Sequence, residues 1–161
     1  MLSPEVTDLF TDTHCHLDFE DYDSDRPAIL ERARANGLAF LINPGIDLPS
    51  SAQALQLAAQ FPGYVYAPAG IHPNYSYLWD DQTENVLQEM ASAQGLVAIG
   101  EIGLDYYRDR TPAVQQQHIF AEPLALAPRL GLPGGSSSWP PACACRLSFT
   151  TAKPQLIFCP C

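Results

Sequence analysis

Residues 10–18 read FTDTHCHLD and place two histidines, His14 and His16, two positions apart after the short apolar run 9–10. Side chains of alternate strand residues point to the same side of a sheet. We therefore expect both imidazoles to face one way, with Asp12 in phase and Asp18 in the loop that follows. Two imidazoles with carboxylates beside them suit a divalent cation such as zinc or manganese. The alternative is a strand end whose polar side chains face water.

The chain up to residue 132 alternates apolar runs with helical patterns. The runs predict strands that begin near residues 9, 39, 65 and 97, and the helical patterns cover residues 26–36, 50–60, 83–93 and 112–130. This alternation is typical of an α/β fold with a parallel sheet. The run 38–43 is apolar almost throughout, which predicts a strand buried on both faces. A TIM-type (β/α)8 barrel needs about 250 residues, so four units predict only its N-terminal half.

The helix ends carry their own signals. Asp25 is expected to cap the first helix, and Ser50 or Ser51 the second. Pro123 and Pro128 fall inside the fourth helical pattern. An interior proline costs about 3 kcal/mol, so we expect that helix to break or kink.

Further polar side chains stand where the strands end. Glu101 lies between glycines in GEIG, residues 100–103, where backbone and ligands can approach closely. A carboxylate there could bridge two cations, which together activate a water and clamp phosphodiester oxygens; the alternative is a surface glutamate. His72 precedes a proline that holds it in extended geometry, where it either contacts a phosphate, supports the ligands or is merely structural. Cys15 is expected to be a buried small hydrophobe, and His118 a helix-surface residue.

Three segments carry a family resemblance: TDTHCHLD at 11–18, GIHP at 70–73 and GEIGLDY at 100–106. In this order and spacing they resemble the signatures of the TatD family of metal-dependent deoxyribonucleases, and the resemblance covers about residues 7–133. It implies a (β/α)8 barrel of the metal-dependent hydrolase superfamily that acts on DNA. It also implies two divalent ions in the full fold, of magnesium, manganese or zinc.

The same resemblance implies roles for five residues. His14 and His16 would be ligands of one metal, while Glu101 would bridge two metals and act as the catalytic residue. His72 and Asp105 would contact the substrate or support the ligands.

The chain departs from the family pattern after residue 133. The family continues with a strand that ends in a metal-binding histidine, followed later by a second histidine and a catalytic aspartate. This chain reads GGSSSWPP at 134–141, and no histidine, aspartate or glutamate follows Glu122. Half of the implied ligands are therefore missing, and we expect this product to be impaired.

Residues 134–161 form a second region, rich in glycine, serine, proline and cysteine, after a partial barrel domain at 1–133. We expect this tail to be irregular or disordered, and its composition favours a shifted reading frame, a splice product or a sequencing error. Zinc binding by its four cysteines is the alternative, although CAC and CPC do not match the usual ligand spacing.

The composition limits the remaining choices. Of the 161 residues, 47% are hydrophobic, which suits one globular domain, and no apolar run is long enough for a membrane span. The N-terminus has no signal-peptide pattern, so a cytoplasmic location is expected. The net charge of −10 disfavours nucleic-acid binding through a basic patch, but it agrees better with an enzyme that approaches phosphates through bound metals.

Two alternatives stay open. A related barrel could hydrolyse small esters or amides instead of DNA. The chain could also be a non-catalytic half-barrel that self-associates through an open sheet edge.

Overall fold

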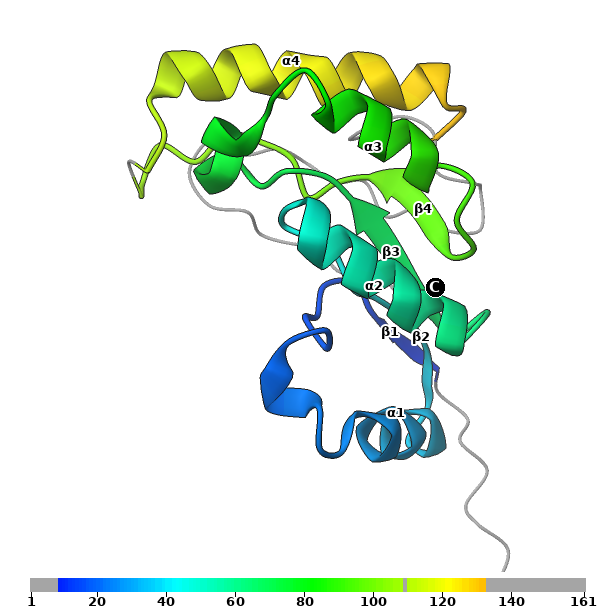
Figure 1. Cartoon of the computed structure of the whole chain (residues 1–161). Helices are drawn as coiled ribbons and strands as arrows, with labels where there is room; N and C mark the ends of the chain where they lie inside the picture. Colours follow the sequence, from blue (N-terminus) through cyan, green and yellow to red (C-terminus); the bar gives the residue numbers. More distant parts are fainter. Residues whose placement is uncertain (1–8, 109, 133–161) are drawn as a thin grey trace, which may run out of the picture.

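The computed structural model describes residues 9–108 and 110–132. Its centre is a parallel sheet in the order β1-β2-β3-β4, formed by β1 (Phe10–Asp12), β2 (Leu38–Ile42), β3 (Val65–Ala69) and β4 (Leu96–Ile99) (Figure 1). The α/β class with parallel strands is confirmed. The tail 134–161 lies outside the described residues, so the domain boundary near residue 133 stays a prediction.

Helices connect the strands, because neighbouring parallel strands need a crossover between them. They are α1 (Arg26–Ala35), α2 (Leu48–Gln60), α3 (Thr83–Met90) and α4 (Ala113–Arg129), with short 3-10 helices η1 (Glu20–Tyr22) and η2 (Pro73–Leu78). Figure 1 shows α2 lying across β2 and β3, with α3 and α4 towards the β4 end of the sheet and α1 at the opposite end. Within the described ranges, none of the helices has the length and apolar character needed to cross a membrane.

The predicted cap of the second helix is wrong, and that of the first is right in position only. α2 begins earlier than expected and is capped by Asp47, whose carboxylate accepts from the backbone N–H of Ser50 at 2.8 Å. Ser50 supports this cap, since its hydroxyl accepts from the backbone N–H of Asp47 at 3.0 Å, which makes a reciprocal capping box. Asp25 does occupy the position before α1, but its side chain makes no capping hydrogen bond.

The expected break in the fourth helix is also wrong. α4 runs continuously through Pro123 and Pro128. Pro123, Leu126 and Ala127 are buried, and burial of an apolar side chain contributes roughly 1.5–3 kcal/mol. Packing on this scale offsets the cost of an interior proline.

The core lies on the helical side of the sheet. One cluster joins α1, α2 and the strands β2 and β3 around Leu30, Leu41, Leu55 and Val65, and a second joins β3, α3 and α4. The expectation that the second strand is buried on both faces is wrong, because Ala39 is exposed. Phe40 of β2 and Tyr66 of β3 meet edge to face and are only half-buried. The face of the sheet that carries them is therefore only partly covered by the described residues.

The long loop after β4 is fixed by one buried side chain from α4. Gln116 is 1% exposed, and its Oε1 accepts from the backbone N–H of Asp105 at 2.7 Å. Its Nε2 donates to the backbone oxygens of Asp105 at 2.9 Å and of Thr111 at 2.7 Å. Gln116 therefore holds the loop at two points, residues 105 and 111.

Replacement of Gln116 by alanine should destabilise the fold, because one N–H and two carbonyls would lose their partner. Each buried polar group left without a partner costs about 1–3 kcal/mol. Water that enters the space left by the side chain would satisfy some of these groups, so we expect the free energy of unfolding to fall by about 3 kcal/mol. Urea unfolding measures it. The matched control is Gln115→Ala, because Gln115 is exposed and a surface change shifts stability by about 0.5 kcal/mol or less. Equal losses in both variants would contradict the role given to Gln116.

Candidate metal centre

Three predicted residues converge beyond the ends of β1 and β4. One donor atom each of His14, His16 and Glu101 lies within 4.8 Å of the other two. The two imidazole Nε2 atoms are 3.2 Å apart, and Glu101 Oε2 lies 3.6 Å from His14 Nε2. The predicted convergence of these side chains is thus confirmed, and we call the three residues the trio.

The trio has the chemistry of a divalent-cation site. A cation bonded to both imidazole nitrogens at about 2.1 Å would hold them about 3.0–3.4 Å apart, and the observed separation is 3.2 Å. Glu101 Oε2 and His16 Nδ1 are buried and have no hydrogen-bond partner within the described residues. Buried polar atoms without a partner are costly, and a cation would satisfy the carboxylate oxygen.

The loop 43–46, which follows β2, holds the other segments of the site. The carbonyl of Gly45 accepts from the backbone N–H of Glu101 at 3.2 Å, and that of Ile46 accepts from His72 N–H at 2.8 Å. The carbonyl of Ile42, the last residue of β2, accepts from Cys15 N–H at 3.0 Å. The segments that carry the histidines and Glu101 are therefore fixed through their backbones.

Asn43, at the start of that loop, orients the first histidine segment. It is fully buried, its Oδ1 accepts from Leu17 N–H at 2.6 Å, and its Nδ2 donates to Asp18 Oδ1 at 2.7 Å. The same Asp18 oxygen lies 4.0 Å from His16 Nδ1. A carboxylate on the Nδ1 side favours the proton there and leaves the Nε2 lone pair for a cation.

His72 lies beside the trio but presents a donor to it. Its Nδ1 accepts from Asn74 N–H at 3.1 Å, so the neutral ring carries its proton on Nε2, which lies 3.6 Å from Glu101 Oε1. Burial lowers the pKa of His72 below its ordinary value, although the carboxylates of Glu101 and Asp105 oppose this shift. A neutral His72 with Nε2–H has no free lone pair for the cation, which agrees with a supporting role.

Asp105, also predicted as a supporting residue, organises the loop after β4. Its carboxylate accepts from the Asn74 side chain at 3.0 Å and from the backbone N–H groups of Tyr107 and Arg108. Burial acts to raise the pKa of Asp105, but these hydrogen bonds outweigh it and lower the pKa below its ordinary value. The charged carboxylate therefore links this loop to η2.

The other residues named from the sequence lie outside the trio. Asp12 accepts from the backbone N–H of His14 at 3.0 Å. Cys15 packs against the core as expected, and burial, with help from Asp12, raises its pKa to about 12, so it stays a thiol. His118 is exposed on α4, as expected.

The close backbone approach expected around Glu101 occurs at a different glycine. A Cβ added to Gly103 would meet nothing, and one added to Gly100 would make only an ordinary contact with Pro68. A Cβ on Gly70, at the end of β3, would lie 2.9 Å from the carbonyl carbon of Gly100. Gly70 is therefore the residue that lets the ends of β3 and β4 meet.

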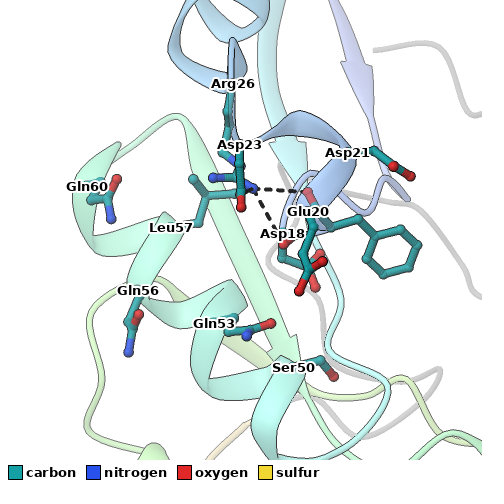
Figure 2. Close-up of a pocket in the computed structure, with 11 residues that line it drawn as sticks. Asp18, Glu20, Asp21, Asp23, Arg26, Ser50, Gln53, Gln56, Leu57 and Gln60 are labelled. Atoms are coloured by element: carbon teal, nitrogen blue, oxygen red, sulfur yellow. Dashed lines mark hydrogen bonds and ion pairs between the residues drawn. The ribbon is translucent and has the colours of Figure 1, made fainter.

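Two cavities border this region. The larger, of about 590 Å³, lies between the acidic loop 18–23 and the polar face of α2 (Figure 2). Arg26 reaches across its wall to the carbonyls of Leu17 and Phe19 and to the Asp23 carboxylate. The smaller, of about 180 Å³, adjoins the trio and is lined in part by His16 and Glu101.

Several residues that shape the site could not be recognised from the sequence. Asn74 and Gln116 are buried polar residues that anchor η2 and the loop after β4, and Arg108 and Arg110 line the smaller cavity. The only signal for the arginines was their place just after the GEIGLDY segment. Nothing in the sequence marks Gln116, because its partners lie in another segment.

Comparisons with known proteins agree with this site. A family model described as TatD related DNase matches residues 11–134. The 3'-5' ssDNA/RNA exonuclease TatD of Rahnella sp. (strain Y9602) is 37% identical over 118 residues, which make up 73% of this chain and 45% of that protein. The uncharacterized metal-dependent hydrolase YabD of Bacillus subtilis (strain 168) is 34% identical over 125 residues, or 78% of this chain and 49% of that protein.

A solved structure shows the same relation. The crystal structure of YJJV, a TatD homologue from Escherichia coli K12, superposes with a TM-score of 0.69 at 36% identity, and covers 77% of this chain and 48% of that one. The chain spans about half the length of the curated relatives it matches. With a family model matched from the first histidine segment to the end of α4, the chain belongs to the TatD related DNase family.

Proposed function

We propose that this chain carries the part of a metal-dependent nuclease site that is built on the first four strands, and that its substrate is single-stranded DNA or RNA. The convergence of His14, His16 and Glu101 on one spot carries this proposal. The named relative that is an exonuclease on single strands supports the choice of substrate. This relative favours a nucleic acid as the substrate over small esters or amides.

In this proposal the trio binds a divalent ion, with magnesium, manganese and zinc as the candidates. A divalent ion supplies Lewis acidity toward a phosphodiester oxygen when it is bound. Glu101 would hold the ion through Oε2, which lies 3.6 Å from His14 Nε2, whereas its Oε1 lies 3.6 Å from His72 Nε2. His72 directs its Nε2 proton towards Glu101 and so steadies that carboxylate.

The chain itself offers few further ligands. Its sequence contains no histidine, aspartate or glutamate after Glu122. The trio supplies only part of the ligand set that the family resemblance implies for two ions, so we expect weak binding and slow hydrolysis. The cytoplasmic location and self-association through an open edge stay predictions.

Metal binding is the first test. Isothermal titration with manganese should detect a weak site that is lost in His14→Ala, because one of three donors disappears. His118→Ala is the matched control, since His118 is exposed on α4, and it should bind manganese as the parent chain does. Tight manganese binding that survives His14→Ala would show that the cation binds at another site, for example at the four cysteines between residues 143 and 161.

Hydrolysis is the second test. Release of nucleotides from a single-stranded oligodeoxynucleotide should require manganese or magnesium and stop in excess chelator. Glu101→Gln should lower the rate by at least about a hundredfold, the upper range for disturbing residues around a metal. Glu89→Gln, which changes an exposed carboxylate on α3, should leave it unchanged. Cleavage of small esters with none of DNA or RNA would favour the related hydrolase activity instead.

A further inference from the structure

The smaller cavity beside the trio is lined by side chains of opposite charge. Arg108 and Arg110, from the loop after β4, line it together with Asn74 and Tyr75 of η2, and it also reaches Glu101. Its volume of about 180 Å³ is below the roughly 300–1,000 Å³ of pockets that hold drug-sized ligands. The space suits one small group and its waters better than a whole nucleotide.

The two arginines are free to bind an anion. Neither guanidinium has an ion pair or hydrogen bond to another residue of the described ranges, and both arginines are exposed. Three other arginines of the described ranges are engaged: Arg26 pairs with Asp23, Arg129 pairs with Glu84, and Arg34 lies over the Tyr64 ring. In a chain with a net charge of −10, two guanidinium groups at one cavity that have no partner among the described residues form a local positive site.

The backbone on either side of the two arginines is anchored without a ligand. The loop that carries them is fixed before them at Asp105 and after them at Thr111, both bonded to Gln116. The backbone N–H of Arg108 also donates to Asp105 at 3.2 Å. An anchored backbone loses less conformational entropy on binding than a free one.

Asn74 adds an independent sign of a ligand. It is 2% exposed, and its Oδ1 is buried without a hydrogen-bond partner in the described part of the chain. Its Nδ2 is occupied by Asp105, so the free group is an acceptor. A hydroxyl or a water that accompanies an anion would satisfy it.

We propose that this cavity is a phosphate subsite, in which Arg108 and Arg110 bind a phosphate group next to the one that is cut at the trio. The forked guanidinium group matches the oxygens of a phosphate. The assignment of the phosphate to a nucleic acid rests on the proposed function, whereas the binding of a phosphate does not. The two arginines would also give this acidic chain a local attraction for its substrate.

The test uses the full chain in chelator, with no metal present. Inorganic phosphate, thymidine 5'-monophosphate and uncharged thymidine are titrated and followed by NMR shifts. Both phosphate compounds should bind and thymidine should not. The double variant Arg108→Gln/Arg110→Gln should weaken phosphate binding by about tenfold, the effect of about 1.4 kcal/mol. Arg32→Gln, on the exposed surface of α1, should bind as the parent chain does.

Several outcomes overturn the subsite: no phosphate binding, equal binding in the double variant, or thymidine binding as well as its phosphate. If the double variant unfolds, phosphate binding is compared in the single variants Arg108→Lys and Arg110→Lys, which keep the positive charge but lose the forked guanidinium group. Phosphate binding at parental strength in both single variants would also overturn the proposed subsite. Phosphate binding without any metal-dependent cleavage would refute the proposed function alone. Cleavage with no phosphate binding would refute the subsite alone.

Discussion

The site depends on the backbone hydrogen bonds of the loop 43–46. Its carbonyls accept from the N–H groups of His72 and Glu101, and its first side chain, Asn43, fixes Leu17 and Asp18. Residues 43–45 are buried, and a buried backbone group must find a partner. The loop therefore cannot shift without leaving groups unpaired in several segments at once. This constraint brings together histidines near the start of the chain and a glutamate that follows the fourth strand.

The sequence predicted the parts of the fold that burial dictates. Apolar runs located the four strands, and their parallel order indicated that His14, His16 and Glu101 lie at one edge of the sheet. Prediction failed where the outcome depended on contacts between distant segments. The choice of Asp47 over Ser50 as the cap depends on the path of the chain into α2, and the continuity of α4 through Pro123 depends on what the helix packs against. Asn43 was visible as a polar residue at a strand end, but its two partners were not.

The trio contains buried polar atoms that have no partner among the described residues, and such atoms lower the stability of the fold. Glu101 Oε2 and His16 Nδ1 are buried without partners in the described ranges, and each unpaired group costs about 1–3 kcal/mol. The surrounding residues show that the fold can satisfy its polar groups elsewhere, since Asn43 and Gln116 use both ends of their amides. In the part of the chain that the structure describes, the unpaired side-chain atoms thus lie in the trio and in Asn74 beside it, where the proposed cation and phosphate would bind.

Further strands packed on the open face of the sheet would also reach the side of the trio. In the described residues the helices cover one face, and Phe40 and Tyr66 on the other are only half-buried. A closed barrel buries such side chains in its interior and has no free edges. Strands that covered this face would also end beside the trio, because parallel strands carry their carboxyl ends to the same side.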